Sequence, residues 1–189
     1  CLLMKDIPSQ ETWSRRFNVS RPCIQRDIAK VKSWFRESGL TLFSQRGKGY
    51  FLERNELRVR QALIRWILEM LGEEIIINIT QQDVDFYHDI LCKRIFGDID
   101  ITEIYQLVNN FFGEADRSMT QFHQTVFALY IGLTLNRKER SVGLDNNEYQ
   151  KESILMFSVH LTRFADILEK TFHTRISSTE LSYMQQIYQ

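Results

Sequence analysis

The chain has 189 residues, which fits one domain of ordinary size or two small ones. Lysine plus arginine equals aspartate plus glutamate, 24 of each, and 43% of the residues are hydrophobic, enough to form a core. The sequence has no run of about 18 apolar residues and no signal-peptide pattern, so neither a transmembrane helix nor secretion is expected. Three cysteines without a CxxC pair favour a reducing cytoplasm over a zinc site or a disulfide framework.

The zero net charge conceals a division of the chain. Residues 1–54 hold 11 lysines and arginines against 5 acidic residues, whereas residues 55–189 hold 13 against 19. Such asymmetry is typical of a nucleic-acid-binding segment followed by a neutral or acidic remainder. Charge alone leaves open a chance segregation of surface residues.

The first predicted element is a short helix over residues 9–17. Ser9 is a favourable N-cap because its hydroxyl can accept a hydrogen bond from a backbone N–H of the first turn. Glu11 then lies near the positive end of the helix dipole. Trp13 and Phe17, one turn apart, are expected to face the core.

A second helix is predicted over residues 21–38, after a turn at residues 18–20. Ser20 is an N-cap, Pro22 fits the first helical turn, and Gly39 ends the helix. The apolar residues recur at helical spacing and are Ile24, Ile28, Val31, Trp34 and Phe35. The other face carries Arg21, Gln25, Arg26, Lys30 and Ser33.

A β-hairpin is predicted next, because strand-forming residues over 40–44 and 50–53 flank a glycine-containing turn. Arg46 and Lys48 lie at its tip. The Gly-Lys-Gly sequence there lacks the spacing and the following Ser or Thr of a phosphate-binding P-loop. Two helices joined by a three-residue turn and followed by a hairpin match a winged helix-turn-helix.

This arrangement predicts binding to double-stranded DNA. Arginine and glutamine pair with the edges of guanine and adenine, whereas arginine, lysine and serine also contact phosphates. We expect base contacts from Arg21, Gln25 and Arg26, which lie early on the second helix. We expect phosphate contacts from Ser20, Lys30, Arg46 and Lys48. The alternative is a helical hairpin whose basic residues are only solvated.

Two stretches, "FNVSRPCIQRDIAKVKSWF" and "GLTLFSQRGKGYFLE", resemble the winged helix-turn-helix of a family of bacterial transcription regulators. These regulators carry regulation domains of the sugar phosphotransferase system (PTS) and include mannitol- and lichenan-type activators and their virulence-regulator relatives. The Val-Ser, Ile-x-Arg-Asp-Ile and Gly-Lys-Gly-Tyr elements carry the match, over residues 9–53. The resemblance implies an earlier helix, of which Leu2-Leu3-Met4 is the expected remnant, so we expect a fragment of a longer protein.

Beyond residue 54 the sequence predicts helices. A long amphipathic helix over 55–72, with Arg58, Arg60 and Arg65 on its polar side and Gly72 at its end, is expected to link two domains or to belong to the second. Further helices are expected at 80–96, 100–112, 118–138, 148–172 and 178–188. The expected fold is therefore mainly α: a winged helix-turn-helix over 1–54, a linker helix, and an all-α bundle over 73–189.

This bundle resembles a PTS regulation domain. In "QTVFALYIGLTLNRKER", Arg137 matches an arginine that follows a family histidine by seven residues, but Tyr130 occupies the histidine position. "ISSTELSYMQQIY" is similar to the closing helix, with Glu180 and Tyr183 in place and Ile187 where a histidine is expected. The family histidines accept phosphoryl groups, so the resemblance implies a domain that senses or dimerises without that chemistry at these positions. A second, intact domain is expected beyond the last residue.

The four histidines suggest little further chemistry. His123 precedes Tyr130 by two helical turns and is considered as a displaced phosphoryl acceptor, against the ordinary case of an exposed or hydrogen-bonded histidine. His160 and His173 lack acidic or cysteine partners at ligand spacing, so neither a metal site nor a cofactor is expected. No constellation of nucleophile and base indicates an enzyme.

Together these features predict a cytoplasmic DNA-binding transcription regulator, and the resemblance implies control of carbohydrate genes. We expect a homodimer whose two wings match two half-sites on double-stranded DNA, with PTS phosphocarrier or enzyme II components as further partners. Two other classes of function stay open. One is an RNA-binding antiterminator, and the other is a protein-interaction or phosphoacceptor module whose basic face meets an acidic partner.

Overall fold

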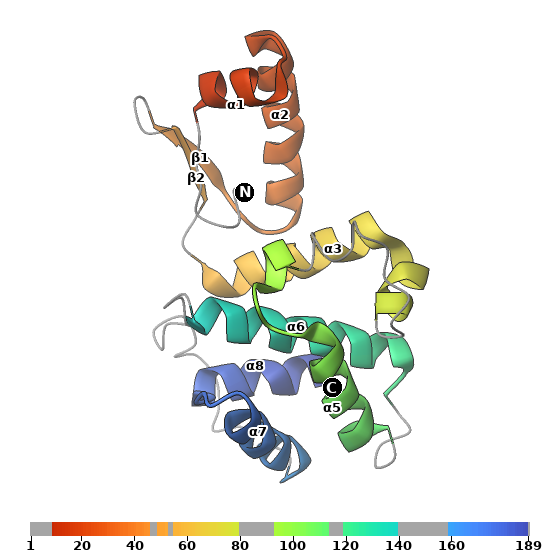
Figure 1. Cartoon of the computed structure of the whole chain (residues 1–189). Helices are drawn as coiled ribbons and strands as arrows, with labels where there is room; N and C mark the ends of the chain where they lie inside the picture. Colours follow the sequence, from red (N-terminus) through yellow and green to blue (C-terminus); the bar gives the residue numbers. More distant parts are fainter. Residues whose placement is uncertain are drawn as a thin grey trace. The chain divides into compact units, whose positions relative to one another are not determined.

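The computed structural model describes residues 9–45, 49–52, 55–79, 93–113, 119–139 and 159–188. The described residues are mainly helical and include one antiparallel two-stranded hairpin, which confirms the mainly-α expectation (Figure 1). The chain divides into two compact units, residues 1–65 and 66–189, and the boundary falls within one long helix. None of the helices in the described ranges combines the length and the apolar character needed to cross a membrane.

The first unit begins with α1 (Gln10–Phe17), which packs against α2 (Arg21–Glu37). The predicted N-cap is confirmed, since the Ser9 hydroxyl oxygen accepts a hydrogen bond of 3.2 Å from the Thr12 amide. Asn18 has a φ of 52° and ends α1 in the left-handed conformation that asparagine tolerates. Helix α2 ends before Gly39, whose φ of 71° suits glycine, as the sequence predicted.

Burial along these helices follows only part of the predicted apolar pattern. Trp13, Ile24 and Phe35 are buried, but Phe17 is 62% exposed and Val31 37% exposed, so the inward orientation expected for these two residues is wrong. A helical stripe is buried only where another element covers it, and α1 spans only eight residues. The periodicity identified the helices and overestimated the extent of their core.

The hairpin consists of β1 (Leu42–Gln45) and β2 (Gly49–Leu52), paired antiparallel with Phe43 opposite Phe51, which confirms the predicted hairpin. Leu42 is buried on the inner face. The ring of Tyr50 stacks on Trp13 at a centroid distance of 5.7 Å, and its hydroxyl accepts a hydrogen bond from the Gln10 side-chain amide. These contacts fix α1 to the hairpin.

Helix α3 (Glu56–Ile79) continues past residue 72, so the expected end at Gly72 is wrong. Glycine inside a helix costs about 1 kcal/mol and ends it only when the following chain leaves the helical conformation. Arg60 does not lie on a polar face as expected, because its side chain is fully buried and paired with Glu56. The Arg58 guanidinium donates to the Gly39 carbonyl oxygen at 2.8 Å and so ties the start of α3 to the end of α2.

The second unit contains α5 (Ile101–Phe112), α6 (Gln121–Glu139), α7 (Val159–Thr171) and α8 (Ser178–Tyr188). These helices confirm the expected helical character where the residues are described, and the expected helical stretches at 80–92 and 148–158 lie outside the described residues. Helix α6 contacts α5 and α8, and α7 contacts α8. A Cβ on Gly132 would lie 2.8 Å from Cδ1 of Ile101, so glycine permits the close approach between α5 and α6.

Candidate nucleic-acid interface

The side chains predicted to contact DNA from α2 are all exposed. Arg21, Gln25, Arg26 and Lys30 lie in the first ten residues of this 17-residue helix. Arg21 and Gln25 are one turn apart, as are Arg26 and Lys30, so each pair follows one stripe of the helix and the two stripes lie on different sides of it. Ile24, between them in sequence, is only 4% exposed and faces the core. The start of α2 therefore presents a polar and basic surface.

Ser20 precedes this surface and occupies the predicted N-cap position of α2, but its side chain does not form the capping hydrogen bond. Its backbone is extended as in an N-cap, but its hydroxyl donates to the Cys23 Sγ at 3.3 Å instead of accepting from a backbone amide. Arg26 also donates to this sulfur, from Nη2 at 3.4 Å. The hydrogen bond from Ser20, and then that from Arg26, lower the pKa of the Cys23 thiol. The spacing of three residues between Ser20, Cys23 and Arg26 was the sequence signal for this cluster.

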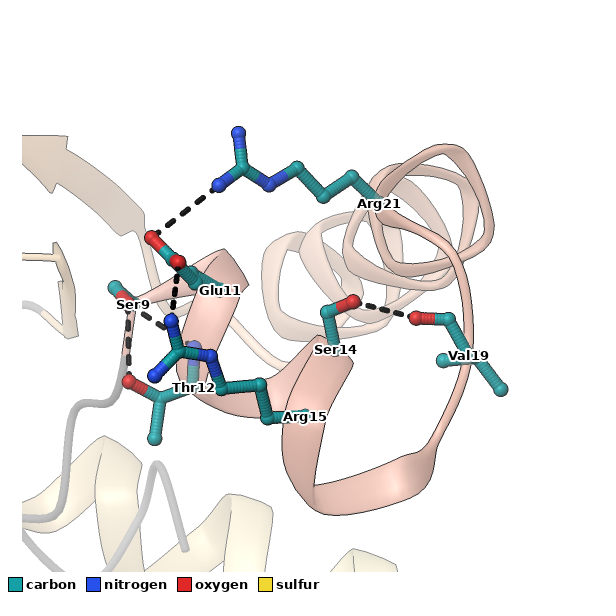
Figure 2. A network of polar contacts seen from close by, with 7 residues as sticks. All are labelled: Ser9, Glu11, Thr12, Ser14, Arg15, Val19 and Arg21. Atoms are coloured by element: carbon teal, nitrogen blue, oxygen red, sulfur yellow. Dashed lines mark hydrogen bonds and ion pairs between the residues drawn. The ribbon is translucent and has the colours of Figure 1, made fainter.

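A network of polar contacts joins α1 to the beginning of α2 (Figure 2). One carboxylate oxygen of Glu11 lies 2.8 Å from Nη2 of Arg15, and the other lies 3.2 Å from Nη2 of Arg21. The side chains of Glu11, Arg15 and Arg21 are 50%, 80% and 64% exposed, so the network is open to solvent. From the sequence, Glu11 was expected only to interact with the helix dipole. Its spacing of four residues from Arg15 is a signal for the Glu11–Arg15 contact, whereas the Glu11–Arg21 contact is visible only in the fold.

The predicted contact residues at the hairpin tip, Arg46 and Lys48, lie outside the described residues. The described strands carry an exposed aromatic pair that was not predicted. Phe43 and Phe51 are 44% and 38% exposed, and their rings stack at a centroid distance of 5.4 Å. The alternation of side chains along a strand could have identified them, since they lie opposite to the face of Leu42.

In the second unit, Tyr130 lies in the core. It is fully buried in α6, its hydroxyl donates to Oε2 of Glu180 at 3.2 Å, and its ring lies 4.9 Å from that of Tyr183. The structure thus brings together three residues that the family resemblance singled out. Arg137 and Ile187 are half-buried, in the last turns of α6 and α8.

His123 does not join this buried group. Its side chain is exposed in the first turn of α6, and its Nδ1 lies 2.7 Å from the Thr120 hydroxyl. Its backbone N–H also donates to that hydroxyl, at 3.3 Å. Within the described ranges, no group of three or more His, Cys, Asp or Glu side chains is arranged to hold a metal ion.

No protein-family model matches the chain, and no curated protein matches it. What the chain binds is therefore inferred from its own side chains and their arrangement.

Proposed function

We propose that the chain is a DNA-binding transcription regulator in which the first unit acts as a winged helix-turn-helix. Helix α2 would be the recognition helix, and the β1–β2 hairpin would be the wing. The observation that carries this proposal is the exposure of Arg21, Gln25, Arg26 and Lys30 on a helix that Ile24 and Phe35 anchor to the core.

This surface has the chemistry of base and backbone recognition. An α-helix fits the major groove of B-form DNA, where arginine and glutamine can form paired hydrogen bonds with guanine and adenine. Arg21, Gln25 and Arg26 precede Lys30 on α2, and the N-terminal residues of a recognition helix are the ones that usually reach base edges. Lys30 and Ser20 are then assigned to phosphates, together with Arg46 and Lys48 of the hairpin tip.

The second unit would sense a signal or dimerise, and so set the spacing of two wings on two half-sites. In a PTS-regulation-like domain, phosphorylation would need an imidazole at the family positions, which Tyr130 and Ile187 do not supply. The hydrogen bond from Tyr130 to buried Glu180 supports a packing role for that position. Any PTS phosphocarrier or enzyme II component would then act through another residue of the protein. If such components regulate the protein, the genes that it controls would be carbohydrate genes.

RNA binding is the second candidate, because the exposed pair Phe43 and Phe51 offers a surface on which unpaired bases can stack. The helices α1 and α2 count against a small all-β RNA-binding module, so duplex DNA is the preferred ligand.

The test is a salt titration of binding to three labelled probes. These are duplex DNA from upstream of the protein's own operon, a scrambled duplex of the same composition, and hairpin RNA. We expect preference for the native duplex, with log K falling steeply as log salt concentration rises, because released counterions accompany each phosphate contact. Preference for the RNA would overturn the wing assignment, and equal weak binding to both duplexes would favour an acidic protein partner.

A further inference from the structure

The contacts of Glu11 suggest how one of the proposed DNA-contacting residues is controlled. Arg21 is the first residue of α2, and its Nη2 lies 3.2 Å from Oε2 of Glu11 on the preceding helix. The opposite oxygen of the same carboxylate holds Arg15 at 2.8 Å. One carboxylate thus holds two guanidinium groups, one from each helix, as Figure 2 shows.

Hydrogen bonds in the turn between α1 and α2 keep the two helices close enough for Glu11 to contact Arg21. The Val19 amide donates to the Ser14 carbonyl oxygen at 3.1 Å, and the Ser14 hydroxyl donates in return to the Val19 carbonyl oxygen. The Asn18 amide donates to the Arg15 carbonyl oxygen at 3.3 Å. Because these bonds close the turn, they hold the end of α1 beside the start of α2, and Glu11, one turn before Arg15, lies within reach of Arg21.

A guanidinium group has five N–H donors, and Glu11 engages Nη2 of Arg21. The side chain is 64% exposed, and it makes no other polar contact with the part of the chain that the structure describes. Its remaining donors are available to a ligand. A guanidinium held by a carboxylate is also less attracted to phosphate, because its charge is already partly neutralised.

We propose that Glu11 is a positioning residue that directs Arg21 to base edges and withholds it from the phosphate backbone. The inference rests on the proposed function, because it concerns the same surface of α2. Glu11 thereby lowers the affinity for DNA of any sequence and raises the discrimination between sequences. Arg15 holds the second carboxylate oxygen and limits the freedom of Glu11 to rotate.

The test uses the full chain and a duplex enriched by the wild-type protein from a randomised library, with a scrambled duplex beside it. In the Glu11→Gln variant the freed Arg21 gains a phosphate contact. The slope of log K against log salt concentration should therefore become steeper by about 0.9. Binding to the scrambled duplex should strengthen, and the preference for the enriched duplex should fall by about fivefold or more, the loss expected for one base contact.

The matched control is Glu37→Gln, which removes the same charge at the far end of α2, where Glu37 lies 3.5 Å from Arg65. This control should keep the wild-type preference. A purely structural role for Glu11 would not change the salt slope. In the Arg21→Ala background, Glu11→Gln should leave the preference unchanged, because the group that it positions is gone.

The outcomes separate this inference from the proposed function. If wild-type protein enriches a duplex and Glu11→Gln retains the full preference, Glu11 does not position Arg21, and DNA recognition still stands. An equal loss of preference with and without Arg21 would also overturn the inference. If the library yields no enriched duplex, the proposed function and the inference both fail.

Discussion

Two Glu–Arg pairs in the first unit have the same chemistry and opposite surroundings. Glu11 and Arg15 in α1, and Glu56 and Arg60 in α3, are each four residues apart, and each pair has an N···O distance of 2.8 Å. The Arg15 side chain is 80% exposed, whereas that of Arg60 is fully buried. Sequence spacing and distance are equal, and burial is the largest difference between the two pairs.

This difference in burial determines how much each pair contributes to stability. An exposed pair contributes little to stability, because water screens both charges. A buried pair has lost its hydration, so its charges depend on the surrounding protein groups for compensation. The pair in α1 suits a binding surface, and the pair in α3 suits the interior.

The largest effect is expected from Arg60→Ala. This change removes the buried guanidinium that donates to the Glu56 carboxylate and should lower the free energy of unfolding by about 3–5 kcal/mol. Urea unfolding followed by tryptophan fluorescence measures this value. A loss as small as that of Arg15→Ala would show that burial does not decide the contribution of these pairs.

Tyr130→Phe extends the comparison to the second unit. The change removes the hydroxyl that donates to buried Glu180, and should cost about 1.5–3 kcal/mol, because the carboxylate loses a hydrogen bond that solvent does not replace. Thermal and urea unfolding by circular dichroism provide the measurement. Tyr105→Phe, at a buried tyrosine of α5, is the matched control and should cost less. Equal losses of stability in both variants would show that the hydrogen bond to Glu180 does not contribute more than an ordinary buried tyrosine hydroxyl.

Arg26→Ala tests an exposed residue by its binding instead of its stability. We expect a loss of about 1–3 kcal/mol in binding the enriched duplex, together with relaxed specificity, and almost no change in unfolding. Fluorescence anisotropy on the enriched and scrambled duplexes provides the affinities. Equal losses on both duplexes would make Arg26 a phosphate contact instead of a base contact.

Arg15→Ala should have a much smaller effect on stability than Arg60→Ala. The exposed pair with Glu11 contributes less than about 0.5 kcal/mol, and raising the salt concentration should reduce even this difference. The same urea titration at low and high salt checks it. A loss above about 1 kcal/mol that persists at high salt would contradict the comparison.

Local structure could be predicted from the sequence more accurately than the burial of individual side chains. Ser9, Asn18 and Gly39 act through their own backbone and nearest neighbours, so the ends of α1 and α2 could be predicted from residue type. Whether Phe17 or Arg60 is buried depends on elements distant in the sequence, and periodicity does not contain that information. The contact between Glu11 and Arg21 was missed for the same reason, because it depends on the geometry of the turn.

The position of Tyr50 has a consequence for the order of folding. The contacts between α1 and α2 join residues close in the chain, whereas the contacts of Tyr50 with Gln10 and Trp13 close a loop of about 40 residues. Short loops close at a lower entropic cost than long ones, so the helical pair should form first and the hairpin should dock onto it afterwards. Tyr50→Ala should then accelerate unfolding of the first unit while leaving the early formation of α1 and α2 nearly unchanged.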